Sequence, residues 1–208
     1  MTPKSLEERI TRLEDIHEIQ NLMSRYEYYH SAGMLEETVQ LFAQKTPGVT
    51  AEAGIRGVYE GIEGIRRLYF EVLKKKNPTG NLVEHDLTTP VIEVAGDGKT
   101  AKGLWLSPGL LTARDDETDE LNAFWDWTKY EVDFVKEDGK WKVWHFHVYL
   151  TFCTPYDEGW VKSMVKVKSS PEIPDELKPD KPTTYHKPYN PSGLAELVPA
   201  PPEPYETY

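Results

Sequence analysis

Helical segments come first in this chain of 208 residues, and long strand-like segments follow them. Helical periodicity occupies residues 6–30, 35–43 and 62–75, with short extended pieces at 49–53 and 57–60, and strand alternation occupies 82–94, 101–112, 122–135 and 141–152. Helices followed by an antiparallel meander are typical of an α+β domain. We therefore predict N-terminal helices packed on one face of a curved antiparallel sheet.

The first helix has a recognisable start and a periodic apolar stripe. Ser5-Leu-Glu-Glu8 has the form of a capping box, in which the first and fourth side chains bond each other's backbone. Apolar residues then recur every three or four positions, at Leu6, Ile10, Leu13, Ile16, Ile19, Leu22, Met23 and Tyr26. This spacing predicts that the stripe is buried against the sheet along its whole length.

The composition changes from Thr154 onward. Eleven of the sixteen prolines fall in this part, among scattered tyrosines and one tryptophan. Such a segment cannot build its own core, although its prolines reduce the entropy lost on ordering. We divide the chain into a domain at 1–153 and a C-terminal extension at 154–208, which we expect to wrap over its own domain or a neighbouring subunit.

Charge and composition exclude several classes of partner. The net charge of −11, without a basic stripe to displace counterions, argues against nucleic acid. No apolar run approaches membrane-spanning length, and the first eight residues lack the apolar core of a signal peptide. The single cysteine, Cys153, excludes an intramolecular disulfide and fits a reducing compartment. We expect a cytoplasmic protein with no membrane or nucleic-acid partner.

Histidines lie in segments that otherwise read as buried strands. In residues 141–152, strict alternation puts His145 and His147 on the same face as Trp141 and Val143. Imidazole titrates near neutral pH, so these groups could move protons in a pocket. The alternative is that they face solvent or are core residues with satisfied hydrogen bonds.

A third histidine, His85, shares a mostly apolar strand face with Val83 and Leu87. Burial there disfavours the charged imidazolium unless a carboxylate is near. Asp126 is the best candidate, because it is the one acid on a face that carries aromatic residues such as Tyr130. We predict a buried pair of His85 and Asp126; with the strand faces reversed, Asp126 is merely a surface acid.

The end of the first helix continues towards this predicted site. Tyr26, Tyr29, His30 and Gly33 are related by steps of three and four residues, so they lie near one line on the helix. Tyr29 and His30 are adjacent, and at most one of them can point fully inward. Tyr26 fits a catalytic role about as well as that of a hydrogen-bonded core residue.

Metal and cofactor motifs are weak or missing. His145-Phe-His147 places two imidazoles on one side of a strand, and His85 with Asp126 could complete a ligand set. An H-x-H motif alone is poor evidence, and no other ligand spacing supports it. The chain also has no phosphate loop, dinucleotide fingerprint or G-x-S-x-G elbow. We predict neither a metal nor a cofactor.

Three segments of the chain resemble the SnoaL-like group of the nuclear transport factor 2-like fold. They are RLEDIHEIQNLMSRY at 12–26, VQLFA at 39–43 and EDGKWKVWH at 137–145. The resemblance covers roughly residues 5–152 and implies a cone-shaped α+β barrel. This scaffold hosts scytalone dehydratase, bile acid 7α-dehydratase, polyketide cyclases and ketosteroid isomerase. Its dehydratases use a tyrosine late in the first helix and a histidine on a central strand, positions that Tyr26 and His85 match. They usually carry an acid a few residues after the tyrosine, where this chain has His30 and Ser31.

The resemblance and the residues together predict a cofactor-independent lyase acting on a small, apolar, aromatic or polycyclic molecule. We expect His85, oriented by Asp126, to act as general base or acid, while Tyr26 and His30 hold or protonate the departing oxygen. The pocket is expected to be lined by Tyr29, Trp105, Tyr130, His145 and His147.

Other functions and assemblies stay open. One is a lyase that releases formaldehyde from lignin-derived aromatic diols, another an isomerase or cyclase, and a third a non-catalytic binding or assembly domain. We expect a homo-oligomer, with a trimer slightly favoured over a dimer. Trp125 and Trp127, on the outer sheet face, would suit the subunit contact.

Overall fold

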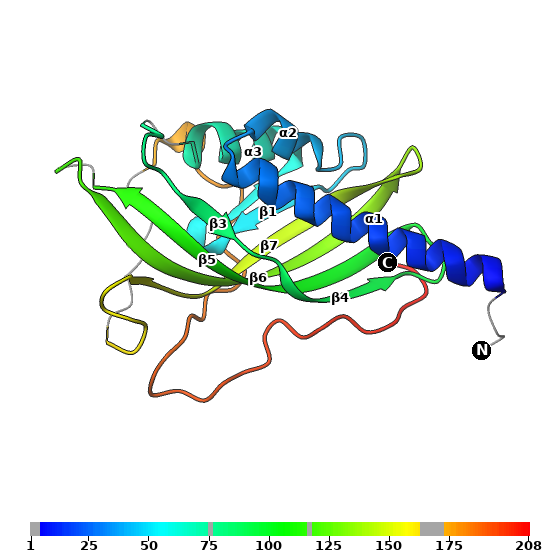
Figure 1. Ribbon diagram of the computed structural model, residues 1–208. Helices are drawn as coiled ribbons and strands as arrows, with labels where there is room; N and C mark the ends of the chain where they lie inside the picture. Colours follow the sequence, from blue (N-terminus) through cyan, green and yellow to red (C-terminus); the bar gives the residue numbers. More distant parts are fainter. Residues whose placement is uncertain (1–4, 75–76, 116–117, 163–172) are drawn as a thin grey trace.

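The computed structural model describes residues 5–74, 77–115, 118–162 and 173–208. Three helices, α1 (Leu6–Ser31), α2 (Leu35–Gln40) and α3 (Gly61–Arg67), cover one face of a curved sheet (Figure 1). The strands are β1 (Thr50–Ala53), β2 (Val58–Glu60), β3 (Val83–His85), β4 (Thr88–Val94), β5 (Thr100–Arg114), β6 (Leu121–Glu137) and β7 (Lys140–Pro155). The predicted α+β class is confirmed.

The sheet is open and almost entirely antiparallel. Its strand order is β2-β1-β7-β6-β5-β3, with β4 also paired to β5, and among the strands of the described residues only β1 and β7 run parallel to each other. The predicted strand at 82–94 is divided into β3 and β4, with a register shift between Thr88 and Val91. Pro90 lies in that shift, and since proline has no N–H to give to the ladder, pairing is interrupted there.

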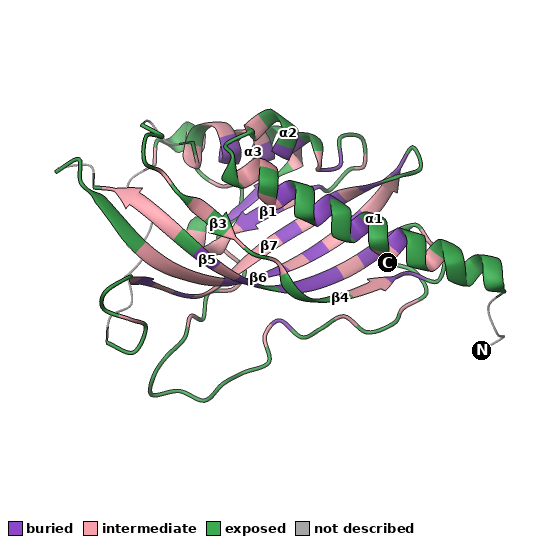
Figure 2. Cartoon of the chain, in the orientation of Figure 1, coloured by how far each residue is buried: buried purple, intermediate pink, exposed green. Residues whose placement is uncertain are grey.

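Helix α1 starts as the sequence predicts, but its first half is not buried. The Ser5 N–H donates to Glu8 Oε2 (2.6 Å) and the Glu8 N–H to Ser5 Oγ (3.1 Å), which confirms the capping box. Figure 2 shows the early turns of α1 largely exposed, and the apolar residues there are Leu6, Ile10 and Leu13. Burial of the whole stripe was therefore a wrong prediction.

A polar residue, not an apolar one, fixes the early part of α1 to the sheet. Asp15 is buried and accepts hydrogen bonds from Lys136 Nζ (2.6 Å) and Trp141 Nε1 (2.8 Å). The apolar contact begins one turn later, where Ile19, Leu22, Met23 and Tyr26 enter the core. The helix thus contacts the concave face of the sheet mainly through its second half.

A β-bulge in β7 changes which side chains enter the core. Val143 pairs with Phe134 and His145 with Asp133, so Trp144 is an extra residue without an opposite partner. Because one inserted residue reverses the alternation, Phe146 faces the core after the bulge, and His145 lies on the convex face. The prediction that His145 and His147 share a face with Trp141 and Val143 is wrong for this reason.

The third helix that the sequence predicts is α-helical only in its first part, α3. A π-helical turn, η2 (Leu68–Val72), follows directly, and the Leu73 N–H donates to the Leu68 carbonyl (2.8 Å). Such wide turns are frequent at functional sites. Tyr69, in this turn, is fully buried. The predicted end of this helix, Lys75, lies outside the described residues.

The described part of the C-terminal extension contacts two sides of the domain: residues 175–177 lie beside α3 and η2, and the last residues of the chain run along the convex face of the sheet (Figure 1). The Val58 N–H donates to Lys181 O (2.9 Å) and the Tyr189 N–H to Thr151 O (2.7 Å), so backbone bonds attach it to its own domain. Trp125 stacks on Tyr156, and Trp127 stacks on Phe152. The outer-face tryptophans therefore contact rings of their own chain, and the homo-oligomer stays a prediction. No described helix is both long enough and apolar enough to cross a bilayer.

Candidate active site

Polar side chains gather in the otherwise apolar space between α1 and the concave face of the sheet. They come from α1, the π-turn η2, β3, β5 and β6, and we call them the buried polar cluster: Tyr26, Glu27, His30, Tyr69, His85, Ser107, Asp126 and Tyr130. Buried polar groups cost free energy unless they are paired, so their concentration in one place indicates a site.

Two phenols form the helix side of the cluster. The hydroxyls of Tyr26 and Tyr69 are 2.6 Å apart, and both rings are buried. Burial, together with the neighbouring phenols and Glu27, raises the pKa of Tyr26 well above its ordinary value. His30 stacks on Tyr26 with ring centroids 5.6 Å apart. The phenols are therefore neutral and can donate protons or hydrogen bonds.

His85 and Asp126 form the sheet side. The structure brings them together as the sequence analysis expected, with His85 Nε2 3.8 Å from Asp126 Oδ2 and side chains only 8% and 13% exposed. Burial, with His30 nearby, lowers the pKa of His85 to about 4. Burial raises the pKa of Asp126 to about 7, although Arg56 opposes the rise. At neutral pH the imidazole is thus an uncharged base beside a carboxyl that titrates.

The ring of Tyr130 joins the two sides. It lies edge-on to Tyr26, with centroids 6.4 Å apart, and tilted against His85 at 6.3 Å. Tyr130 pairs with Trp105 across β5 and β6. Trp105 itself is buried edge-on to Phe134, so it is part of the apolar core next to the cluster.

A glycine makes room for the His85 ring. Gly109 pairs directly with His85, and a Cβ at position 109 would lie 2.5 Å from His85 Nδ1. Among the described residues, His85 Nδ1 and Asp126 Oδ1 are buried without a hydrogen-bond partner. Such atoms are costly to leave unpaired, which makes them candidates for contact with a ligand.

The sequence analysis missed Glu27. Burial raises the pKa of its carboxyl well above the ordinary value, and the Tyr130 hydroxyl is close enough to oppose this rise. No described group has hydrogen-bond geometry with either carboxyl oxygen. The signal was present, because Glu27 follows Met23 by four residues and Ile19 by eight, on the buried side of α1.

Arg56 and Tyr69 were missed as well. Arg56 is the last residue of the short 3₁₀ turn η1 (Gly54–Arg56). Its side chain reaches solvent, but many protein atoms surround it, and this partial burial lowers its pKa. Its charge acts on Asp126 and Cys153. Neither residue belongs to a motif, so no local sequence pattern could have assigned them to the site.

Besides Trp105, three expected pocket residues lie outside the cluster. His145 and His147 are on the convex face, where His145 Nδ1 bonds Asp133 Oδ2 (2.9 Å) and His147 Nε2 lies 3.5 Å from Glu52 Oε1. Tyr29 is half-buried on α1. Hollows of about 830 and 300 Å³ lie on the convex face and beside the first turns of α1, and neither is lined by His85. A substrate cavity around His85 stays a prediction.

Metal binding finds no support in the geometry. Within the described ranges, no three or more histidine, cysteine, aspartate or glutamate side chains are grouped so that they could hold a metal ion. The H-x-H pair is also directed away from His85, since the bulge puts it on the opposite face.

The fold and the buried polar cluster define an α+β protein with ionisable groups between its first helix and its sheet. Residues 11–147 match the family model of the SnoaL-like domain, and the chain belongs to this family, within the nuclear transport factor 2-like group. The match confirms the resemblance seen in the sequence. No curated protein matches the chain at a significant level.

Solved structures with the same fold are only distantly similar in sequence. A candidate scytalone dehydratase from Novosphingobium aromaticivorans has 18% identity and a TM-score of 0.59, over 71% of this chain and 91% of that one. A hexachlorocyclohexane dehydrochlorinase from Novosphingobium barchaimii has 17% identity and a TM-score of 0.56, over 71% and 93%. A candidate dehydratase from Streptomyces avermitilis has 17% identity and a TM-score of 0.54, over 65% and 95%. These likenesses establish the fold.

Proposed function

We propose that the chain is a cofactor-independent lyase that eliminates a small group from an apolar, aromatic or polycyclic molecule. One observation carries the proposal: an uncharged His85 imidazole beside Asp126 faces, across the Tyr130 ring, a pair of neutral phenols. An elimination requires a base and a proton donor that can both reach the substrate. Two structures of this fold, a candidate dehydratase and a dehydrochlorinase, carry names that denote eliminations.

The base is His85. Its low pKa keeps a nitrogen lone pair available at neutral pH, so it can remove a proton from a substrate carbon. The resulting imidazolium is stabilised by the ionised form of Asp126, which lies within ion-pair distance. Burial of both groups strengthens this interaction, because the dielectric constant is lower there than in water.

The proton donors are on α1 and η2. Tyr26 is hydrogen-bonded to Tyr69 and can pass a proton to a departing oxygen, after which water leaves with the carbon–oxygen electron pair. Burial raises the pKa of Glu27 well above its ordinary value, and in its protonated form this carboxyl can donate the same proton. The ring of His30 stacks on Tyr26 and positions it. One proton is removed from carbon and one is added to oxygen, so the elimination balances.

The same residues also suit an isomerase or a cyclase. Asp126 titrates near neutrality, and a carboxyl of this kind could help to return the proton to a different carbon. Release of formaldehyde from an aromatic diol would instead break a carbon–carbon bond with the same base. Product analysis distinguishes these reactions, and a protein that binds without turnover would be a binding domain.

The test is turnover of a panel of aromatic and polycyclic alcohols, followed by mass spectrometry for loss of water or formaldehyde. His85→Gln is expected to lower turnover about 10²-fold or more, with the fold retained in thermal unfolding. His17→Gln, which changes an exposed histidine on α1, is the matched control and should keep full activity. Equal turnover in both variants, or none in the parent across the panel, would refute the proposal.

A further inference from the structure

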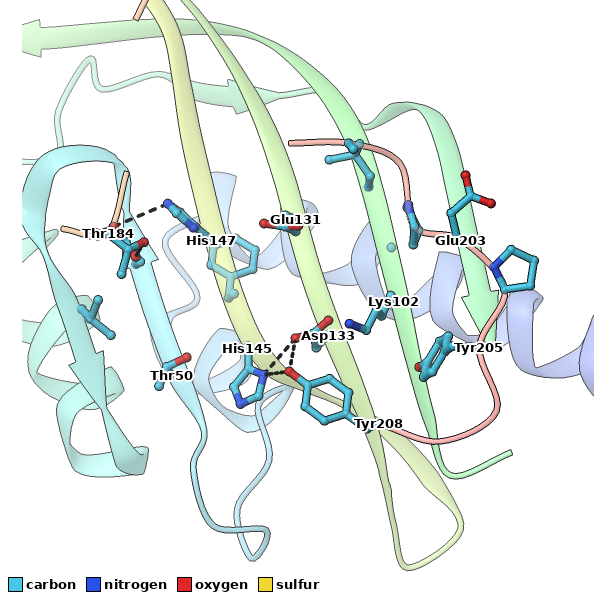
Figure 3. A pocket seen from close by; sticks show the side chains of 18 of the residues that line it. Thr50, Lys102, Glu131, Asp133, His145, His147, Thr184, Glu203, Tyr205 and Tyr208 are labelled. Atoms are coloured by element: carbon cyan, nitrogen blue, oxygen red, sulfur yellow. Dashed lines mark hydrogen bonds and ion pairs between the residues drawn. The ribbon is translucent and has the colours of Figure 1, made fainter. Parts of the chain in front are cut away.

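The larger hollow, about 830 Å³, is a groove between the convex sheet face and the end of the C-terminal extension. Figure 3 shows its floor formed by side chains from four neighbouring strands, with residues 200–208 passing over it. The register places the floor residues in two rows across the sheet: Lys102, Asp133, His145 and Thr50 in one, and Leu104, Glu131, His147 and Glu52 in the other. Its volume is typical of a small-molecule site.

The groove carries an excess of negative charge. Its lining includes four carboxylates, Glu52, Glu131, Asp133 and Glu203, against a single ammonium group, that of Lys102. Among the described residues, none of these carboxylates forms an ion pair with lysine or arginine. A concave surface lined by one sign of charge concentrates ligands of the opposite sign.

The hydrogen bonds within the groove leave that charge in place. Glu131 accepts from the Tyr149 hydroxyl (2.6 Å), and Asp133 accepts from the Tyr208 hydroxyl (2.8 Å). These hydroxyl donors are neutral. Two histidines also contact groove carboxylates: His145 Nδ1 lies 2.9 Å from Asp133 Oδ2, and His147 Nε2 lies 3.5 Å from Glu52 Oε1. Burial lowers the pKa of His147, so its imidazole adds no positive charge at neutral pH. Glu131 is therefore oriented by a neutral partner and keeps its charge for a ligand, whereas Asp133 Oδ2 is shared with the His145 imidazole.

The roof of the groove consists of aromatic rings that already hold one cation. Lys102 Nζ lies 5.5 Å from the ring centroid of Tyr205 and 4.8 Å from that of Tyr208. Backbone bonds fix the roof, since Gly96 N–H donates to Tyr205 O (2.9 Å) and Asp97 N–H to Glu206 O (3.1 Å). Ring faces beside carboxylates suit organic ammonium groups, which are attracted by both.

We propose that this groove binds a small aliphatic diammonium ion. Glu131 and Asp133 are two residues apart on one strand face, about 6.6 Å, a separation that a four-carbon spacer between two ammonium groups can span. A bare metal ion is a poorer match, because no suitable group of three ligands occurs among the residues described. The groove is on the opposite face from the buried polar cluster, so this proposal does not depend on the proposed lyase reaction.

The test is titration calorimetry of the full chain with putrescine as probe. Saturable 1:1 binding is expected, weakened about tenfold or more in Glu131→Gln, which keeps an acceptor for Tyr149. Lys102→Gln removes the resident cation and should tighten binding severalfold. Glu63→Gln removes an exposed carboxylate on α3 and should change nothing. Thermal unfolding of each variant verifies the fold.

Neutral 1,4-butanediol and magnesium chloride are the control ligands, and neither should give saturable heat at the same concentrations. Three results would overturn the proposal: no saturable binding of putrescine by the parent, equal binding of butanediol or Mg²⁺, or equal weakening by Glu63→Gln and Glu131→Gln. If Glu131→Gln loses binding because it misfolds, the result for Lys102→Gln decides the test. Damage to the fold cannot produce the tighter binding that is predicted for Lys102→Gln.

Discussion

Replacing His85 by Gln and, separately, Asp126 by Asn should change the pH dependence of stability in opposite directions. The folded-state pKa of His85 is about 4 against an ordinary 6.5, so between these values the unfolded chain binds more protons than the folded one. Stability from His85 is therefore complete above pH 6.5 and is lost as the pH falls towards 4. A difference of about 2.5 units corresponds to about 3 kcal/mol.

Asp126 has the opposite sign. Its pKa is about 7 in the folded chain against an ordinary 3.8, so the folded state holds the extra proton, and stability falls as the pH rises between these values. Over the window from pH 4 to 6.5 this loss also amounts to about 3 kcal/mol. The two contributions nearly cancel in the parent protein, which hides both of them.

Each substitution removes one of the two contributions. From pH 4 to 6.5, the free energy of unfolding of His85→Gln should fall by about 3 kcal/mol relative to the parent, and that of Asp126→Asn should rise by a similar amount. Urea unfolding at several pH values, followed by tryptophan fluorescence, measures both, and other titrating groups cancel in the difference from the parent. If both variants follow the parent profile within about 1 kcal/mol, burial does not control these groups as argued.

Two further predictions concern the same cluster. Gly109→Ala should lower the free energy of unfolding by about 1–3 kcal/mol and abolish turnover, because its Cβ would collide with His85. The control Gly193→Ala, in the extension, should change neither property. Urea unfolding measures the stability and the alcohol panel measures the turnover. Tyr26→Phe should cost about 1–3 kcal/mol by leaving the Tyr69 hydroxyl unpaired, and the double variant with Tyr69→Phe should cost less than the sum of the single changes. Additive costs would mean that the two hydroxyls do not depend on each other.

The sequence by itself determined the elements and part of the site. The capping box set the start of α1, and helices before strands predicted the fold class. Period-two alternation correctly placed His85 and Asp126 on inward faces, because no bulge intervenes on β3 or in β6 before Asp126. The three segments that carry the family resemblance lie within residues 11–147, which match the family model.

Only the tertiary structure decided the rest. The bulge at Trp144 arises from register with β6, which no single strand reveals, and one inserted residue moved His145 and His147 to the other face. Glu27 and Arg56 gained their roles from neighbours distant in sequence. The alternation of residues along one strand predicts which face a side chain occupies only while that strand is regular. Pairing between strands decides where that regularity stops, and therefore which groups meet.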